Sequence, residues 1–285
     1  MGDANAILLL SCPDQKGLVA TVSNFIFQHN GNIVHADQHT SQPEKNFFLR
    51  IEWELEGFLI PREEIARSFT PLAERFGMTW HLHFTDYVPR MALFVSRHVH
   101  CFHDLILRQR MGEFRAEIPL VVSNHPDLRP LVEHLGMHYE YIPIAAENKP
   151  EQEARELALL RRHGIDFVVL ARYMQILSAD FVAALCNRII NIHHSFLPAF
   201  AGGKPYQQAY DRGVKIIGAT SHYVTEILDK GPIIAQDVIK ISHRDTVDDI
   251  KLRGKDLERI VLARAVRLHV ESRILVHGSK TVIFE

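Results

Sequence analysis

The sequence predicts an α/β protein of two domains, a ferredoxin-like α+β domain followed by a Rossmann-like domain with a mostly parallel sheet. Before residue 86, the apolar segments follow the order strand, helix, strand, strand, helix, strand. After residue 90, strand-like and helix-like segments alternate, which is typical of a parallel sheet covered on both faces. The linker DYVPR separates the two patterns, so we expect domains at 1–86 and 87–285.

The first domain is defined by short apolar segments bounded by turn residues. The turn PDQKG follows the first segment, NGN ends an amphipathic helix, and QPEK predicts a hairpin connection. In NFFLRIEWEL apolar residues alternate with largely polar ones, so one face of that strand is expected to be buried. The four predicted strands are AILLLSC, NIVHADQHTS, NFFLRIEWEL and MTWHLHFTD.

The second domain has five apolar segments that predict strands, separated by helical stretches such as KPEQEARELALLRRHG. These segments are MALFVS, IPLVVSN, YEYIPI, DFVVLA and RIINI. In open α/β sheets, ligands bind beyond the carboxyl ends of the strands. The polar stretch NIHHS, at the end of the RII segment, therefore lies where a functional site is expected.

Composition excludes several classes of partner. The formal net charge of -2 predicts no general attraction to nucleic acid, and no apolar stretch approaches the length of a membrane span. The three cysteines, Cys12, Cys101 and Cys186, are widely spaced and form no CxxC pair. A reduced cytoplasmic protein without nucleic-acid or membrane partners is therefore expected.

Asn191 and His193 are candidate catalytic residues because residues two apart on a strand face the same side. An amide and an imidazole side by side can stabilise the oxyanion of acyl-transfer chemistry. Asp229, in the loop LDKGP, can accept a proton, hold a water or pair with His193, whose pKa it would then raise. The alternatives are a turn-capping Asn, a structural His and a turn Asp, and spacing alone does not bring 193 and 229 together.

The combination of two motifs resembles the folate-dependent formyltransferase family over about residues 90 to 285. The motifs are NIHHSFLP (191–198) and SHYVTEILDKGP (221–232). The resemblance implies catalytic roles for Asn191, His193 and Asp229, with 10-formyltetrahydrofolate as substrate and neither cofactor nor metal. DFVVLARYMQILS resembles a pterin-contacting segment of the family. The residues that the resemblance places against the substrate are Met174, Ile176, Leu177, His222, Thr225 and Leu228.

One departure from the transferase pattern concerns the acceptor. The stretch FVSRHVHCFHDLI (94–106) contains no glycine where the family's ribonucleotide transferases have a glycine-rich phosphate loop. Bulky residues there would block close approach of a phosphate to the backbone. With water as the natural acceptor, the chain resembles the formyltetrahydrofolate deformylases, which release tetrahydrofolate and formate, supply formate for purine biosynthesis and balance folate pools.

Three alternatives to this function remain open on the sequence. The first is a formyltransferase with a different amine acceptor, and the second is a non-enzymatic amino-acid sensor on an inactive scaffold. The third is a metal site at His193, His194, His222 and Asp229, which the absence of an H-E-x-x-H pattern disfavours. His194 is expected to face away from His193 on the strand. Arg172 and Lys204 are candidates for contact with the anionic glutamate tail of folate.

The segment LSCPDQKGLVATVSNFIFQHNGNI resembles the opening of an ACT domain, a small module that often binds amino acids. The helix N-terminus beside a glycine can receive a carboxylate. The resemblance implies a possible amino-acid effector site at Asp14, Lys16, Gly17 and Leu18. The alternative is that Gly17 only closes the turn and the module mediates subunit contacts. A homo-oligomer is implied in either case.

Overall fold

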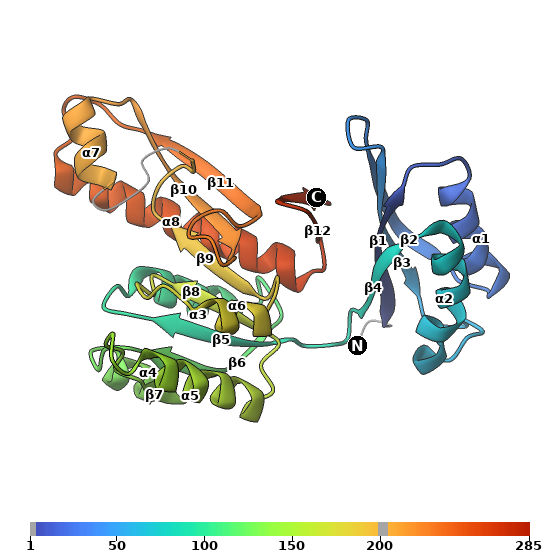
Figure 1. Cartoon of the computed structure of the whole chain (residues 1–285), viewed down its shortest axis with the longest axis horizontal. Coiled ribbons are helices and arrows are strands. Elements are labelled where there is room, and N and C mark those ends of the chain that lie inside the picture. The colour runs from blue at the N-terminus through green and yellow to red at the C-terminus, as the bar shows by residue number, and fades with distance from the viewer. Residues whose placement is uncertain (1–3, 199–204) are drawn as a thin grey trace. The chain divides into compact units, whose positions relative to one another are not determined.

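The computed structural model describes residues 4–198 and 205–285, and the chain divides into two compact units (Figure 1). Unit 1 runs to Val88 and also includes residues 271–277 and 281–285. Unit 2 comprises Pro89–Val270 and residues 278–280. These units differ from the expected ranges of 1–86 and 87–285 mainly at the C-terminus, which packs on unit 1.

Unit 1 is an antiparallel sheet of four strands in the order β2-β3-β1-β4, combined with two helices. Its elements are β1 (Asn5–Pro13), α1 (Leu18–Gln28), β2 (Ile33–Ser41), β3 (Asn46–Glu54), η1 (Arg62–Glu64), α2 (Ile65–Phe76) and β4 (Thr79–Phe84). Leu8 and Leu10 of β1 pack with Val22 of α1 and Phe69 of α2 in one core. The predicted ferredoxin-like order of strands and helices is confirmed.

The other face of this sheet receives the C-terminal segment. Strands β12 (Ile274–His277) and β13 (Lys280–Ile283) pair with each other. Leu9 and Phe48 pack against Leu275 and Phe284, because Leu9 alternates with the core residues of β1 and so faces the opposite side. Arg50, only 3% exposed, donates from Nε to the carbonyl of Ser272 at 3.1 Å. Apolar packing and this buried bond attach the segment to unit 1.

Unit 2 is a seven-stranded sheet in the order β11-β10-β9-β8-β5-β6-β7, with helices between most strands. The strands are β5 (Arg90–Val95), β6 (Glu117–Ser123), β7 (Tyr139–Tyr141), β8 (Phe167–Ala171), β9 (Ile189–His193), β10 (Ile216–Tyr223) and β11 (Ile233–Lys240). The helices are α3 (His100–Arg110), α4 (Arg129–His134), α5 (Lys149–Arg162), α6 (Ala179–Ala184), α7 (Pro205–Arg212) and α8 (Val247–Val270). Strands β5 to β9 pair in parallel and β10 pairs antiparallel with β9 and β11, so the Rossmann-like prediction is confirmed.

The strand order of unit 2 reverses between β5 and β8. From β5 the chain proceeds to β6 and β7 on one side, and then returns to β8 and β9 on the other. Open α/β sheets hold their ligands beyond the carboxyl ends of the strands at such a reversal. A functional site is therefore expected among the residues that follow β5, β8 and β9. Across the described residues, no helix is both long and apolar enough to span a membrane.

Candidate active site

Strand β9 places Asn191 and His193 on one side, as predicted, and β10 adds His222 opposite Asn191. The Asn191 amide donates a hydrogen bond to His222 Nε2 at 3.2 Å, a cross-strand contact between directly paired residues. His222 is 2% exposed and His193 is 7% exposed. The sheet thus holds an amide and two imidazoles in a largely buried group.

Asp229 reaches this group because the loop after β10 folds back tightly on its own strand. The Tyr223 N–H donates to the Pro232 carbonyl at 2.9 Å, which closes the loop. A Cβ on Gly231 would lie 1.6 Å from the Tyr223 carbonyl oxygen, so only glycine fits there. Asp229 itself has a positive φ of 56°, a conformation that Asp tolerates better than most residues. Its Oδ1 lies 3.3 Å from His193 Nδ1 and 3.8 Å from His222 Nε2.

The partners of the two imidazoles assign their protons. His222 Nδ1 donates to the Tyr223 carbonyl at 2.9 Å, which leaves Nε2 to accept from Asn191. His193 Nδ1 faces the Asp229 carboxylate, so its Nε2 accepts from the Ser195 hydroxyl at 2.8 Å. Both rings are therefore assigned as neutral Nδ1–H tautomers. The basic nitrogen of His193 is the one that faces away from Asp229.

Burial decides the charge of His193. Burial lowers the pKa of His193 below its ordinary value of 6.5, and the charge of Asp229 raises it by less. The pKa of His222 is also lowered, again by burial first. The expected effect of Asp229, which raises the His193 pKa, is present, but burial outweighs it and the net shift is downward. At neutral pH His193 is a neutral base with a carboxylate beside it.

His194 and Arg172 differ from the expectations for them. Strand β9 ends at His193, so His194 does not alternate away, and the two rings lie 5.3 Å apart. Burial, followed by the Arg172 charge, lowers the pKa of His194 to about 4. The Arg172 side chain is only 11% exposed and lies 3.5 Å from Glu258, so the expected contact with a folate tail is wrong for it. Lys204 lies outside the described residues.

The residues expected to hold the substrate divide by exposure. Met174, Ile176 and Leu228 are 58%, 59% and 59% exposed, unusual values for apolar side chains beside a polar site. Leu177, by contrast, lies in the unit 2 core, against which Val224 of the other loop also packs. That shared core anchors the loops after β8 and β10.

The loop after β10 has an internal hydrogen bond and one further exposed apolar residue. Thr225 donates from Oγ1 to the Ile227 carbonyl at 3.1 Å and so shapes the loop. Ile227 is itself 67% exposed, and the sequence reasoning missed it. The signal that would have indicated Ile227 is an apolar residue in the loop between β10 and the candidate residue Asp229. With Met174, Ile176 and Leu228, it gives the two loops four exposed apolar side chains.

The expected effector turn in unit 1 lies between β1 and α1. Gly17 has φ of 89° and precedes the helix, and a Cβ there would meet no atom, so backbone conformation selects glycine. Asp14 and Lys16 are exposed, and the Asp14 N–H donates to the Lys45 carbonyl at 2.8 Å. Leu18 is 2% exposed and belongs to the core, so its side chain anchors the helix.

The second unit belongs to the formyl transferase class of proteins. A formyl transferase family model matches residues 89–266, and an ACT domain model matches residues 6–64. Similarity extends over the whole chain. A formyltetrahydrofolate deformylase from Synechocystis sp. is 55% identical over 284 residues and covers 100% of both chains. One from Bacillus subtilis is 50% identical, covering 97% of this chain and 93% of its own.

A solved structure agrees with these relatives. The crystal structure of a formyltetrahydrofolate deformylase from Pseudomonas syringae pv. tomato superposes with a TM-score of 0.97 and 44% identity. The alignment covers 100% of this chain and 96% of that one. The chain therefore belongs to the formyltetrahydrofolate deformylase family.

Proposed function

We propose that this chain hydrolyses 10-formyltetrahydrofolate to tetrahydrofolate and formate. The single observation that supports this most is the convergence of Asn191, His193 and Asp229 within one hydrogen-bonding group, in a chain of the deformylase family. The reaction would supply formate for purine biosynthesis and balance the one-carbon folate pool. A formyltransferase using an amine acceptor is the alternative, and the family relationship does not favour it.

The proposed mechanism begins with neutral His193. Asp229 fixes the Nδ1–H tautomer of His193. The attacking water is held at His193 Nε2, beside the Ser195 hydroxyl, and Nε2 takes the proton that the water loses. The Asn191 amide has a second N–H besides the one directed at His222, and it donates to the developing oxyanion. The His193 imidazolium formed in this step returns its proton to N10 as the C–N10 bond breaks. Tetrahydrofolate and formate are the products.

His222 acts as a positioning residue in this proposal. Its Nδ1–H is held by the Tyr223 carbonyl, and its Nε2 accepts the first Asn191 N–H. The ring therefore fixes the direction of the amide and leaves the other donor for the substrate. Conversion of His222 to Gln would keep an acceptor near Asn191, whereas conversion to Leu would not.

The pterin ring is proposed to bind between the loops after β8 and β10. Met174, Ile176 and Leu228 expose apolar surface there, together with Ile227. A flat aromatic ligand that covers such side chains removes apolar area from water, which favours binding by about 25 cal/mol per Å². Leu177 and Thr225 support the loops from within. The substrate is the only folate that the reaction requires, and no cofactor is proposed.

Regulation is proposed to act through unit 1. The exposed turn at Asp14, Lys16 and Gly17 precedes the α1 N-terminus, where an amino-acid carboxylate can be bound by backbone N–H groups. A homo-oligomer formed through the ACT-like unit is part of the proposal. The cytoplasm is the proposed compartment, in keeping with the free state of Cys12, Cys101 and Cys186.

A formate-release assay tests the function. Purified chain is given 10-formyltetrahydrofolate with no amine present, and formate and tetrahydrofolate are measured in parallel; we expect them in equal amounts. His193→Ala should abolish the reaction, whereas His103→Ala, at an exposed position of α3, should not. No formate without an amine, but formyl transfer once an amine is added, would establish the alternative function. Repeating the assay with each amino acid tests the effector.

A further inference from the structure

A group of buried polar side chains lies beyond the strand reversal of unit 2, where open α/β sheets hold their ligands. The expected ligand crevice lies beyond the carboxyl ends of β5 and β8, where the strand order reverses. His100 begins the helix that follows β5, and Arg172 directly follows β8. These two side chains meet Tyr206 of α7 and Glu258 of α8. We call His100, Arg172, Tyr206 and Glu258 the Glu258 cluster.

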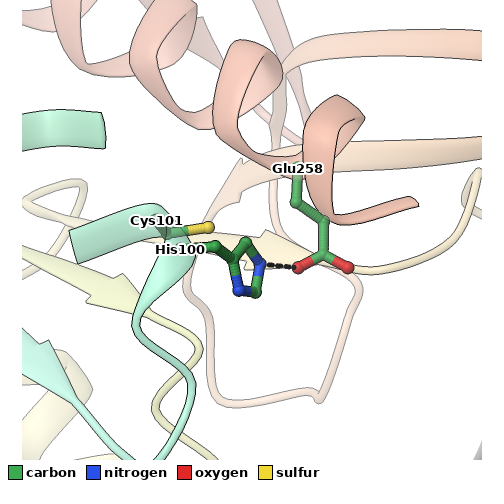
Figure 2. Close-up of side chains that lie close together, drawn as sticks. All are labelled: His100, Cys101 and Glu258. Carbon is green, nitrogen blue, oxygen red and sulfur yellow. Dashed lines mark hydrogen bonds and ion pairs between the residues drawn. The ribbon is translucent and has the colours of Figure 1, made fainter. Parts of the chain in front are cut away.

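Glu258 is the centre of this cluster and is 1% exposed. Its Oε2 lies 2.8 Å from His100 Nε2 and 3.5 Å from Arg172 Nε, and Tyr206 donates its hydroxyl proton to Oε1. Figure 2 shows the His100 ring directed at the Glu258 carboxylate from the facing helix. Burial raises the pKa of Glu258, but the His100 bond, the Arg172 charge and the Tyr206 bond outweigh it and hold the pKa below its ordinary value. The carboxylate is therefore ionised.

Gly254 shows that α8 is shaped around the cluster. A Cβ at this position would lie 2.3 Å from the Tyr206 hydroxyl oxygen and 2.4 Å from Cζ. Glycine within a helix costs about 1 kcal/mol relative to alanine. The missing side chain at Gly254 leaves space for the Tyr206 ring one helical turn before Glu258. The Tyr206 hydroxyl can therefore donate its hydrogen bond to Glu258.

The cluster adjoins the reaction centre. The His194 ring lies 5.9 Å from that of Tyr206 and 5.3 Å from that of His193. Arg172 comes two residues after Leu170, which pairs with Asn191. Within the described parts of the chain, Arg172 Nε and Nη1 are buried and make no hydrogen bond. The guanidinium can therefore donate more hydrogen bonds to an anion than it donates to Glu258.

A metal centre is the rival explanation for part of this cluster. His100, Cys101 and Glu258 offer ligand atoms within 4.8 Å of one another, as drawn in Figure 2. However, His100 Nε2 lies 2.8 Å from Glu258 Oε2, which is a direct hydrogen-bond distance. The Arg172 guanidinium lies 3.5 Å from the same carboxylate oxygen and would repel a cation. The geometry favours an internal ion pair.

We propose that the Glu258 cluster selects water as the formyl acceptor. The Glu258 carboxylate occupies the position in the crevice where the anionic group of a larger acceptor would bind, and its partners fill the approach to the formyl carbon. Only water then reaches the carbon from that side. The inference rests on the proposed hydrolysis and names the residues that set its specificity.

Removal of the Glu258 carboxylate tests whether the cluster selects water as the formyl acceptor. Glu258→Ala opens space and exposes the Arg172 guanidinium, so an amine that carries its own carboxylate should enter; the probe is aminooxyacetate, whose nitrogen is neutral at pH 7. That nitrogen attacks the formyl carbon, the C–N10 bond breaks, and N10 takes the proton that the nitrogen loses. We expect the ratio of N-formylated probe to formate to rise by about tenfold or more over wild type. Methoxyamine, which has no carboxylate, should respond less.

A second variant opens the crevice without removing the anion. His100→Ala leaves Glu258 with Arg172 and Tyr206, so it keeps a compensated charge and should fold even if Glu258→Ala does not. In this variant the neutral methoxyamine should become the better acceptor, the reverse of Glu258→Ala. Asp245→Ala is the matched control, because it removes another largely buried carboxylate, which lies in the loop before α8 and pairs with Arg253 of α8 at 3.0 Å. Its product ratio should equal that of wild type.

The outcomes separate the two proposals. Wild-type protein that releases no formate contradicts the proposed hydrolysis, whatever the variants do. Formate release by wild type, with formate as the only product of folded His100→Ala and Glu258→Ala, overturns the role of the cluster alone. Stoichiometric zinc in wild type that Cys101→Ser loses would overturn it in favour of a metal centre.

Discussion

Two polar clusters of unit 2 contain similar side chains but differ in what they leave available. In the proposed reaction centre, Asp229 is 20% exposed and its Oδ1 lies 3.3 and 3.8 Å from the imidazoles of His193 and His222. In the Glu258 cluster the carboxylate is 1% exposed and has a histidine, an arginine and a tyrosine as partners. A carboxylate with loose contacts and an open side can take part in chemistry. One enclosed by donors contributes shape and charge instead.

The largest expected effect is a loss of turnover when the Asp229 charge is removed. Asp229→Asn keeps the shape of the side chain but removes the charge that orients His193, so kcat for formate release should fall by about 10²- to 10⁴-fold. The free energy of unfolding should change little, as measured by urea denaturation. Glu258→Gln is the paired variant. Here we expect kcat to change little and the free energy of unfolding to fall, because a buried Arg172 without its anion costs about 3 kcal/mol of stability. Equal losses of turnover in both variants would contradict the distinction.

The next prediction concerns the loop that carries Asp229. Gly231→Ala places a Cβ 1.6 Å from the Tyr223 carbonyl, so the loop must move and Asp229 with it. We expect kcat to fall by at least about tenfold, since small misplacement of a catalytic group is costly. Gly136→Ala is the control: its φ is 74° but no atom crowds the site, so only backbone strain is introduced. Normal turnover in Gly231→Ala would show that the loop position does not matter.

A pH profile sharpens the comparison by testing which form of His193 is active. Burial lowers the folded-state pKa of His193 below 6.5, and the neutral ring is the proposed base. Therefore kcat/KM should rise with pH along a limb centred below 6.5 and stay level above it. His193 and His222 both face Asp229, so the limb reports an apparent pKa of the group. A limb centred above pH 7 would mean that the imidazolium is the resting form.

The smallest expected effect lies outside both clusters, at Glu156 of α5. This carboxyl is fully buried, and burial raises its pKa to about 7 although the Tyr173 hydroxyl donates to it at 2.9 Å. Its folded pKa exceeds the ordinary 4.5, so stability should be full below pH 4.5 and decline as pH rises toward 7. Glu156→Gln should remove this decline in unfolding experiments at a series of pH values, with turnover retained. An unchanged decline would assign it to another group.

Much of the fold was predictable because its signals are local. The alternation in NFFLRIEWEL and the apolar segments of the second domain marked strands that the structure contains. The C-terminal strands were harder to place, since their partners Leu9 and Phe48 lie more than 200 residues earlier. Arg172 was misassigned for the same reason. A charged residue after a strand gives no sign in the sequence that a glutamate on a remote helix will enclose it.

The sequence by itself determined the order of elements, the same-side placement of Asn191 and His193, and the motifs that indicate the family, because periodicity and motif spacing are properties of neighbouring residues. Only the tertiary structure decided that Asp229 reaches His193, that burial outweighs that carboxylate in the pKa of the ring, and that His100, Arg172 and Tyr206 enclose Glu258. Each of these depends on distance through space and on exclusion of water. Such quantities arise only when segments remote in the chain pack together.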